Sequence, residues 1–286
     1  MSIFTPNQLF IRNSKTINLM KKYYLFIALA MVAGMTVSCK NNKKAEADAE
    51  VVEAAKTILA DDVLATLDEY AQACNEEAGK TSVSETISSA LTEEEKLIKP
   101  DYLLEADQVN ALITKSQKAA AIAILSLERP IRQAYGLSTK ETDEAAARLA
   151  AELNHPVFDN DTNQTLSENA KKAYETYKEK GNIAGFWQFN LALQVEADYL
   201  ISKNADVIFR NLTEENYASL TKKFSMITAA VKTLAEYDPE VKQAWDAFNA
   251  GGEIVTNLSK ESIEYGKNFF IERTDVHAAR RAALLK

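Results

Sequence analysis

The sequence contains few of the residues that end secondary structure or that carry metal and redox chemistry. It has 8 Gly, 5 Pro, 2 Cys and 2 His in 286 residues. Sandwiches, barrels and propellers need a turn about every ten residues, so the scarcity of Gly and Pro excludes them. Two cysteines exclude a disulfide framework and a zinc module built from several cysteines.

Charge and hydrophobicity narrow the class of protein further. Lys and Arg number 33 against 41 Asp and Glu, a net charge of −8 that argues against a nucleic-acid partner. Hydrophobic residues make up 47% of the chain, which is enough to bury a core and excludes global disorder. The length fits one large domain or two ordinary ones.

Residues 1–38 have the pattern of an export signal. Met20, Lys21 and Lys22 form a short basic start, and the 13 residues 25–37 carry no charge. Such a run is too short to span a bilayer but fits the apolar core of a signal peptide. Residues 1–19 contain no acidic residue and look like upstream sequence, so Met20 is the expected start.

The apolar run ends at Cys39, and this arrangement resembles the lipobox of bacterial lipoproteins. Ser38 precedes the cysteine and Lys40 opens a polar stretch. The resemblance implies transfer of a diacylglyceryl group to the Cys39 sulfur, cleavage before Cys39 and acylation of the new amino group. Thr36 stands where most lipoboxes have Leu, and such looser motifs resemble those of Bacteroidota. The alternative is an ordinary secretory signal with an incidental cysteine.

Residues 39–50 are interpreted as the lipidated cysteine and a short tether. By resemblance to known sorting signals, Lys40 favours the outer membrane, and the basic residues after the cysteine favour its periplasmic face over the cell surface. The expected location is therefore the cell envelope, with the lipid bilayer as a partner through acylated Cys39. Acyl chains, not surface charge, would hold the acidic chain there.

Helical periodicity is the main signal after residue 50. Apolar spacing predicts helices over about 45–78, 100–130, 138–153, 165–180, 183–210 and 213–237, one from 239 to near the C-terminus, and a short one near residue 92. Thr92, Ser138 and Thr165 each precede a Glu by three residues, which predicts capping boxes. No strand-like alternation is evident. The predicted fold is therefore all-α, an antiparallel bundle of about eight helices without a sheet.

Three details of this bundle can be tested. Pro130 is expected to kink or end its helix. Gly251 and Gly252 are expected to remain inside one long helix, because the apolar register continues through them. A faint similarity between segments 137–156 and 212–239 indicates either a duplication, dividing the all-helical domain 51–286 into halves 51–156 and 165–286, or only the common pattern of helix ends.

Each candidate for chemistry has a structural alternative. Glu152 and His155 have the spacing of one ligand pair in di-iron bundles, but Pro156 follows and a helix-terminal histidine explains the pattern. Segment 159–167 resembles the first half of a calcium loop but lacks the turn Gly and the bidentate Glu. Cys74 lies on an apolar stripe, as a buried small hydrophobe would. We therefore predict no catalytic residues, no metal and no cofactor.

The aromatic residues Phe186, Trp187 and Trp245 are the candidate ligand-binding residues. Together they could form a flat platform for a glycan, peptide or lipid. The alternative is that they belong to the core, where aromatic residues at helical spacing are common.

Segments 99–104, 115–118 and 149–156 resemble helical lipoproteins of Bacteroidota that have no assigned activity. This resemblance supports location and fold without a mechanism. The first functional hypothesis is a non-enzymatic interaction or scaffolding module whose partner is another envelope protein or a second copy. The second is a ligand-binding lipoprotein that uses the aromatic groove. The third is a hydrolase or metalloprotein.

Overall fold

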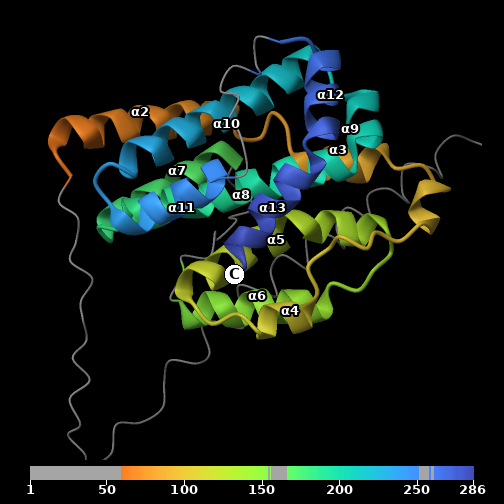
Figure 1. The fold of residues 1–286 in the computed structure, drawn as a ribbon, viewed down its shortest axis with the longest axis horizontal. Coiled ribbons are helices and arrows are strands. Elements are labelled where there is room, and N and C mark those ends of the chain that lie inside the picture. The colour runs from red at the N-terminus through yellow and green to blue at the C-terminus, as the bar shows by residue number, and fades with distance from the viewer. Residues whose placement is uncertain (1–58, 154, 156–165, 251–257, 259–260) are drawn as a thin grey trace, which may run out of the picture. The chain divides into compact units, whose positions relative to one another are not determined.

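The computed structural model describes residues 59–153, 155, 166–250, 258 and 261–286, and all of them fall in one of the two units of the chain. The described residues form helices and no strand, so the prediction of an all-α fold is confirmed (Figure 1). The helices are α2 (Asp61–Glu77), α3 (Val83–Ala90), the 3-10 helix η2 (Glu95–Leu97), α4 (Ala106–Asn110), α5 (Lys115–Ala134), α6 (Lys140–Glu152), α7 (Leu166–Glu179), α8 (Ile183–Lys203), α9 (Ala205–Asn211), α10 (Glu214–Leu234), α11 (Pro239–Ala250), α12 (Ile263–Glu272) and α13 (Thr274–Leu284).

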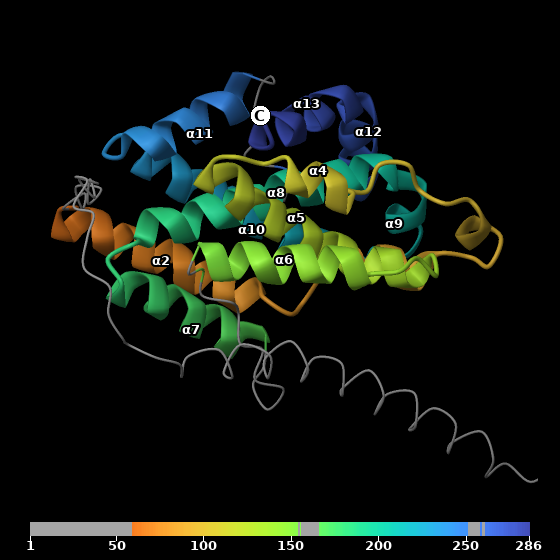
Figure 2. The same cartoon turned by 90° about the horizontal axis from the view of Figure 1, so that it is seen from below.

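Helix α8 is the centre of the fold, as its apolar sequence predicts. It packs against α5, α10 and α13, and it is enclosed by other helices in both views (Figures 1 and 2). Trp187, Leu191 and Leu200 are among its fully buried side chains. A helix that is apolar on more than one face can be stable only where neighbours cover each face, which explains this position.

Several predicted helix boundaries are confirmed by the contacts that cap them. The Thr92 hydroxyl accepts from the Glu95 amide at 3.2 Å, and the Glu95 carboxylate accepts from the Thr92 amide at 2.8 Å, which completes the capping box. Thr213 caps α10 by accepting from the Asn216 amide at 3.2 Å. The apolar residues of α10 at alternating spacings of three and four, which is typical of near-parallel helix packing, are all buried: Tyr217, Leu220, Phe224, Ile227, Val231 and Leu234.

Other helix boundaries differ from those predicted by periodicity, at α3 and α5 because a side chain caps the start of the helix. Residues 59 and 60 are not helical, so the first described helix begins at Asp61 and not near residue 45. The predicted helix 100–130 is divided into α4 and α5, because Thr114 and Gln117 form a capping box that starts α5. The predicted box at Ser138 is absent, since its hydroxyl accepts from the Lys140 amide instead. Helix α3 lies in a stretch expected to be irregular.

Two expectations about helix continuity also differ from the structure: α5 does not end at Pro130, and the helix predicted from residue 239 is not continuous. Helix α5 continues through Pro130 to Ala134, because the residues beyond the proline, Ile131 and Arg132, are buried by their neighbours. The long helix predicted from residue 239 onward is interrupted, since Ser262 caps a new helix by accepting from the Tyr265 amide at 3.2 Å. Gly251 and Gly252 themselves lie outside the described residues.

The segments before and after residues 156–165 pack together. Helix α2 lies against α10 and α7, α3 lies against α9, and α5 lies against α8. Two buried clusters combine residues from both segments, and one of them contains both Leu67 of α2 and Trp187 of α8. The described parts of the predicted halves 51–156 and 165–286 therefore share their hydrophobic cores, whatever their evolutionary origin.

Gly266 of α12 approaches the buried ring of Tyr217 on α10. A Cβ added to Gly266 would lie within 2.6 Å of the Tyr217 ring carbons Cε2 and Cζ. Ala normally stabilises a helix over Gly by about 1 kcal/mol. Here we expect Gly266→Ala to lower the free energy of unfolding by about 1–3 kcal/mol, measured by urea denaturation, because overpacking displaces a rigid ring. In a Tyr217→Leu background the same change should cost much less; an equal cost would contradict the steric cause.

Candidate functional site

Helix α8 carries buried polar side chains within an otherwise largely apolar helix. Gln194, Glu196 and Asp198 are each at least nine-tenths buried. Gln194 and Asp198 are four residues apart and share one face of the helix, whereas Glu196 points to another. Opposite these residues, helix α13 contributes His277 and Arg280, which are both buried, and Arg281. The two helices therefore meet at two polar clusters, a charge network around Glu196 and a cavity beside Asp198.

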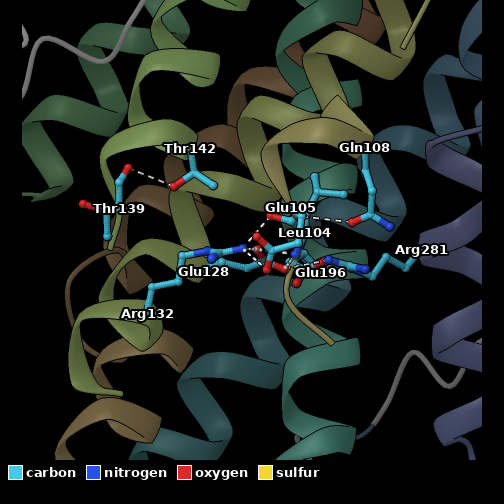
Figure 3. A network of polar contacts seen from close by, with 9 residues as sticks. All are labelled: Leu104, Glu105, Gln108, Glu128, Arg132, Thr139, Thr142, Glu196 and Arg281. Atoms are coloured by element: carbon cyan, nitrogen blue, oxygen red, sulfur yellow. Dashed lines mark hydrogen bonds and ion pairs between the residues drawn. The ribbon is translucent and has the colours of Figure 1, made fainter. Parts of the chain in front are cut away.

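Arg281 holds the charge network together. Its Nε donates to Glu196 Oε2 at 2.6 Å, and its terminal nitrogen donates to Glu128 Oε1 at 2.6 Å (Figure 3). Both carboxylates have no exposed surface. The guanidinium also lies over the Tyr199 ring, 4.8 Å from its centroid. Arg281 of the C-terminal helix thus bonds residues of both α5 and α8. These charged contacts, together with packing, fix the position of α13 against the two helices.

The network extends into the segment before α4. The Leu104 amide donates to both oxygens of Glu128, at 2.8 and 2.9 Å, and Arg132 donates to the Leu104 carbonyl at 2.6 Å (Figure 3). Arg132 also bonds Glu105 at 3.1 Å. The buried polar groups of this segment therefore find partners on α5, as a buried backbone requires.

Burial and charge act in opposite directions on the two carboxyls. Burial raises the pKa of Glu128, and the Arg281 cation opposes that rise. Burial also raises the pKa of Glu196; Arg281 opposes this, and the negative charge of Glu128 adds to it. Such an arrangement depends on Arg281, because two buried carboxylates without that cation would repel each other in a low-dielectric interior.

The second cluster is a small cavity of about 30 Å³ beside α8, α10 and α13. Polar groups on its wall include Asp198, Thr221 and His277, with apolar side chains such as Phe269 and Leu258 around them. The His277 ring has 1% exposure, and its Nδ1 lies 3.9 Å from Asp198 Oδ2. Small-molecule sites usually measure about 300–1,000 Å³. The cavity is thus far smaller than a glycan or peptide requires.

The carboxyl of Asp198 and the imidazole of His277, both on this wall, have pKa shifts that favour their uncharged forms. Burial raises the pKa of Asp198 to about 7, against an opposing effect of Arg280. Burial, with the cations Arg280 and Arg273, lowers the pKa of His277 to about 4. Near neutral pH the imidazole is therefore neutral, while Asp198 is close to its midpoint.

The structure places the aromatic candidates in the core. Trp187 has no exposed surface and Phe186 has 6%, and each packs edge-on against Tyr174. Trp245 is partly buried and lies against the same cluster and against Phe248. A buried indole offers no face to a sugar or peptide, so the ligand platform expected at Trp187 and Phe186 is wrong, and the core alternative explains these residues.

The remaining sequence candidates do not converge. Glu152 is exposed and pairs with Lys118, whereas His155 Nε2 lies 2.8 Å from the Tyr177 hydroxyl. Burial raises the pKa of Cys74 to about 12, which disfavours a reactive thiolate. Within the described part of the chain, no group of three or more His, Cys, Asp or Glu side chains is placed to hold a metal ion. Cys39 and segment 159–165 lie outside the described residues.

Sequence reasoning missed the charged residues between α8 and α13. The available signal was a pair of acidic residues, Glu196 and Asp198, within the stretch 191–201, in which Gln194 is the one other strongly polar residue. Charges in a buried helix need partners, so they predict cationic residues elsewhere. The partners Arg280 and Arg281 lie near the C-terminus of a helix, where the helix dipole also favours cations. Because that explanation was sufficient from the sequence, their contacts with α8 were not predicted.

Comparisons of the chain with protein-family models, with curated proteins and with solved structures found no match. No helix in the described ranges combines the length and the apolar character needed to cross a membrane.

Proposed function

We propose that this chain is a lipid-anchored protein of the bacterial cell envelope, whose helical unit is a non-enzymatic interaction or scaffolding module. The observation that carries the proposal is Cys39, which stands where the uncharged run 25–37 gives way to a polar stretch. Acylation at Cys39 would hold the protein at the bilayer; Lys40 favours the outer membrane, and the basic residues after the cysteine favour its periplasmic face.

The tertiary contacts support the scaffolding part of this proposal. Buried charges are often used to hold elements in a unique arrangement, and here Arg281 joins three helices through Glu128 and Glu196. Glu128, Glu196 and Arg281 are therefore engaged in contacts between helices. A helical unit whose helices are held together by buried ion pairs can present surface residues at fixed positions. An interaction module needs such fixed positions.

When the full chain is expressed with its own export signal, Cys39→Ala is expected to abolish its association with the membrane. Without a thiol there is no acceptor for the diacylglyceryl group, so incorporation of a labelled fatty acid should also be lost. The measurement is fractionation of cells together with the fatty-acid label.

The matched control is Cys74→Ala, which removes the other cysteine and should leave both the label and membrane association unchanged. Persistent labelling of Cys39→Ala, or wild-type protein in the soluble fraction, would show that the chain is not anchored through Cys39.

A further inference from the structure

The loop between α3 and α4 exposes two adjacent apolar side chains. Leu97 is 81% exposed and Ile98 is 75% exposed, with Lys96 and Lys99 on either side. In Figure 2 this loop is the gold segment at the right, which extends past the ends of the neighbouring helices. Isolated exposed apolar residues are common, but a neighbouring pair at the end of a projecting loop is a candidate contact surface.

The loop is held in place at its base. Arg210 of α9 bonds the Glu95 carboxylate at 2.6 Å and the Ala90 carbonyl at 3.1 Å. On either side of the tip, Leu91 and Leu103 are buried in the cluster that also contains Leu200 of α8. Leu97 and Ile98 are therefore presented at a defined position, so little conformational entropy would be lost when they contact a surface.

Charges around the tip nearly balance, with Asp101 leaving one negative charge in excess. Glu93 pairs with Lys96 at 2.7 Å, and Glu95 pairs with Arg210 at 2.6 Å. Glu94 and Lys99 have opposite signs. The tip therefore has neither a strong attraction for anionic groups nor a strong repulsion from them, and its contact should depend on the apolar side chains and little on salt.

We propose that Leu97 and Ile98 insert into the bilayer to which the chain is anchored, an inference that rests on the proposed function. A stable protein partner would require about 800 Å² of surface from each side, far more than two side chains supply. A lipid surface has no such requirement, because apolar side chains partition into the interfacial region without a complementary shape.

The chain length keeps the helical unit near the bilayer. Twenty-one residues separate Cys39 from Asp61, where α2 begins. Even a fully extended connection of that length spans no more than about 75 Å. The anchor would thus confine the helical unit next to the membrane, and this high local concentration lets a weak contact persist that would be lost in solution.

The test uses the full-length acylated protein with Leu97→Trp, reconstituted into phosphatidylcholine vesicles with brominated acyl chains. The emission of the unmodified protein, from Trp187 and Trp245, is subtracted. The matched control is Ile113→Trp, which places tryptophan at a single apolar residue with 83% exposure. We expect several-fold stronger quenching at position 97 than at position 113. This difference should remain in high salt.

A second variant, Leu97→Trp with Ile98→Glu, should lose most of the quenching, because a carboxylate beside the probe opposes insertion. Equal quenching at positions 97 and 113, or quenching abolished by salt, would overturn the proposal. An emission shift that grows with protein density, without lipid quenching, would identify a second copy as the occupant and also overturn it. Fatty-acid labelling on the same preparation separates the two proposals: acylated protein without quenching refutes the insertion alone, whereas unacylated protein refutes the anchor.

Discussion

Arg281→Met is expected to lower the free energy of unfolding by about 3–5 kcal/mol, the cost of removing one partner from a buried ion pair. Glu128 and Glu196 would remain buried without the cation that lies 2.6 Å from each. Methionine keeps much of the volume of the arginine stem, so the loss reports on charge more than on packing. Urea unfolding at neutral pH measures it.

Two further variants test the cause. Adding Glu196→Gln to Arg281→Met should restore part of the lost stability, because it neutralises one of the two carboxylates while keeping its shape. Lys242→Met, which removes a cation from the exposed pair with Asp246, should change stability by less than about 1 kcal/mol. If Arg281→Met costs no more than Lys242→Met, the network does not hold α13 in place.

The Asp198 and His277 variants are expected to change the pH dependence of stability in opposite directions. The pKa of Asp198 rises from 3.8 when unfolded to about 7 in the fold, so its contribution to stability is lost as pH rises from about 4 to 7. The pKa of His277 falls from 6.5 to about 4, so its contribution is lost as pH falls from about 6.5 to 4. In the unmodified protein the two effects largely cancel between pH 4 and 6.5.

Each single substitution should reveal how the other, remaining group makes the free energy of unfolding depend on pH. Asp198→Asn should lose stability relative to the unmodified protein as pH falls from 6.5 to 4, and His277→Gln should lose it as pH rises from 4 to 7. Each slope should approach about 1.4 kcal/mol per pH unit, the value for one proton. The double variant should follow the unmodified protein between pH 4 and 6.5. Single variants parallel to the unmodified protein throughout would contradict the assigned protonation states.

Helix ends were predicted best where the signal is local. Thr92 and Thr213 cap the helices that follow them, and Gly79, Gly136 and Gly181 adopt positive φ just after helix ends. These outcomes depend on residues three or four positions apart, which a sequence displays directly. The break at Ser262 was missed because the apolar register continued across it, and a register shows which face is buried without showing that the helix is continuous.

The candidate site was harder to predict because its residues are distant in sequence. Glu128, Glu196 and Arg281 come from three helices, and each alone resembles an ordinary surface residue. Trp187 shows the reverse problem, since an aromatic residue suits both a binding platform and a core. Only the packing of Tyr174 and Phe186 around it decides between them.

The sequence by itself determined the all-helical character of the described chain, because hydrophobic periodicity, caps and the scarcity of Gly and Pro are local properties of the backbone and its side chains. It also contains the pattern at Cys39 on which the proposed anchor rests. The tertiary structure alone decided which helices meet, that Trp187 is buried, and that acidic residues of α8 face cations of α13. Burial, and the pKa values that follow from it, belong to the assembled fold, because they depend on how many neighbours exclude water from a side chain.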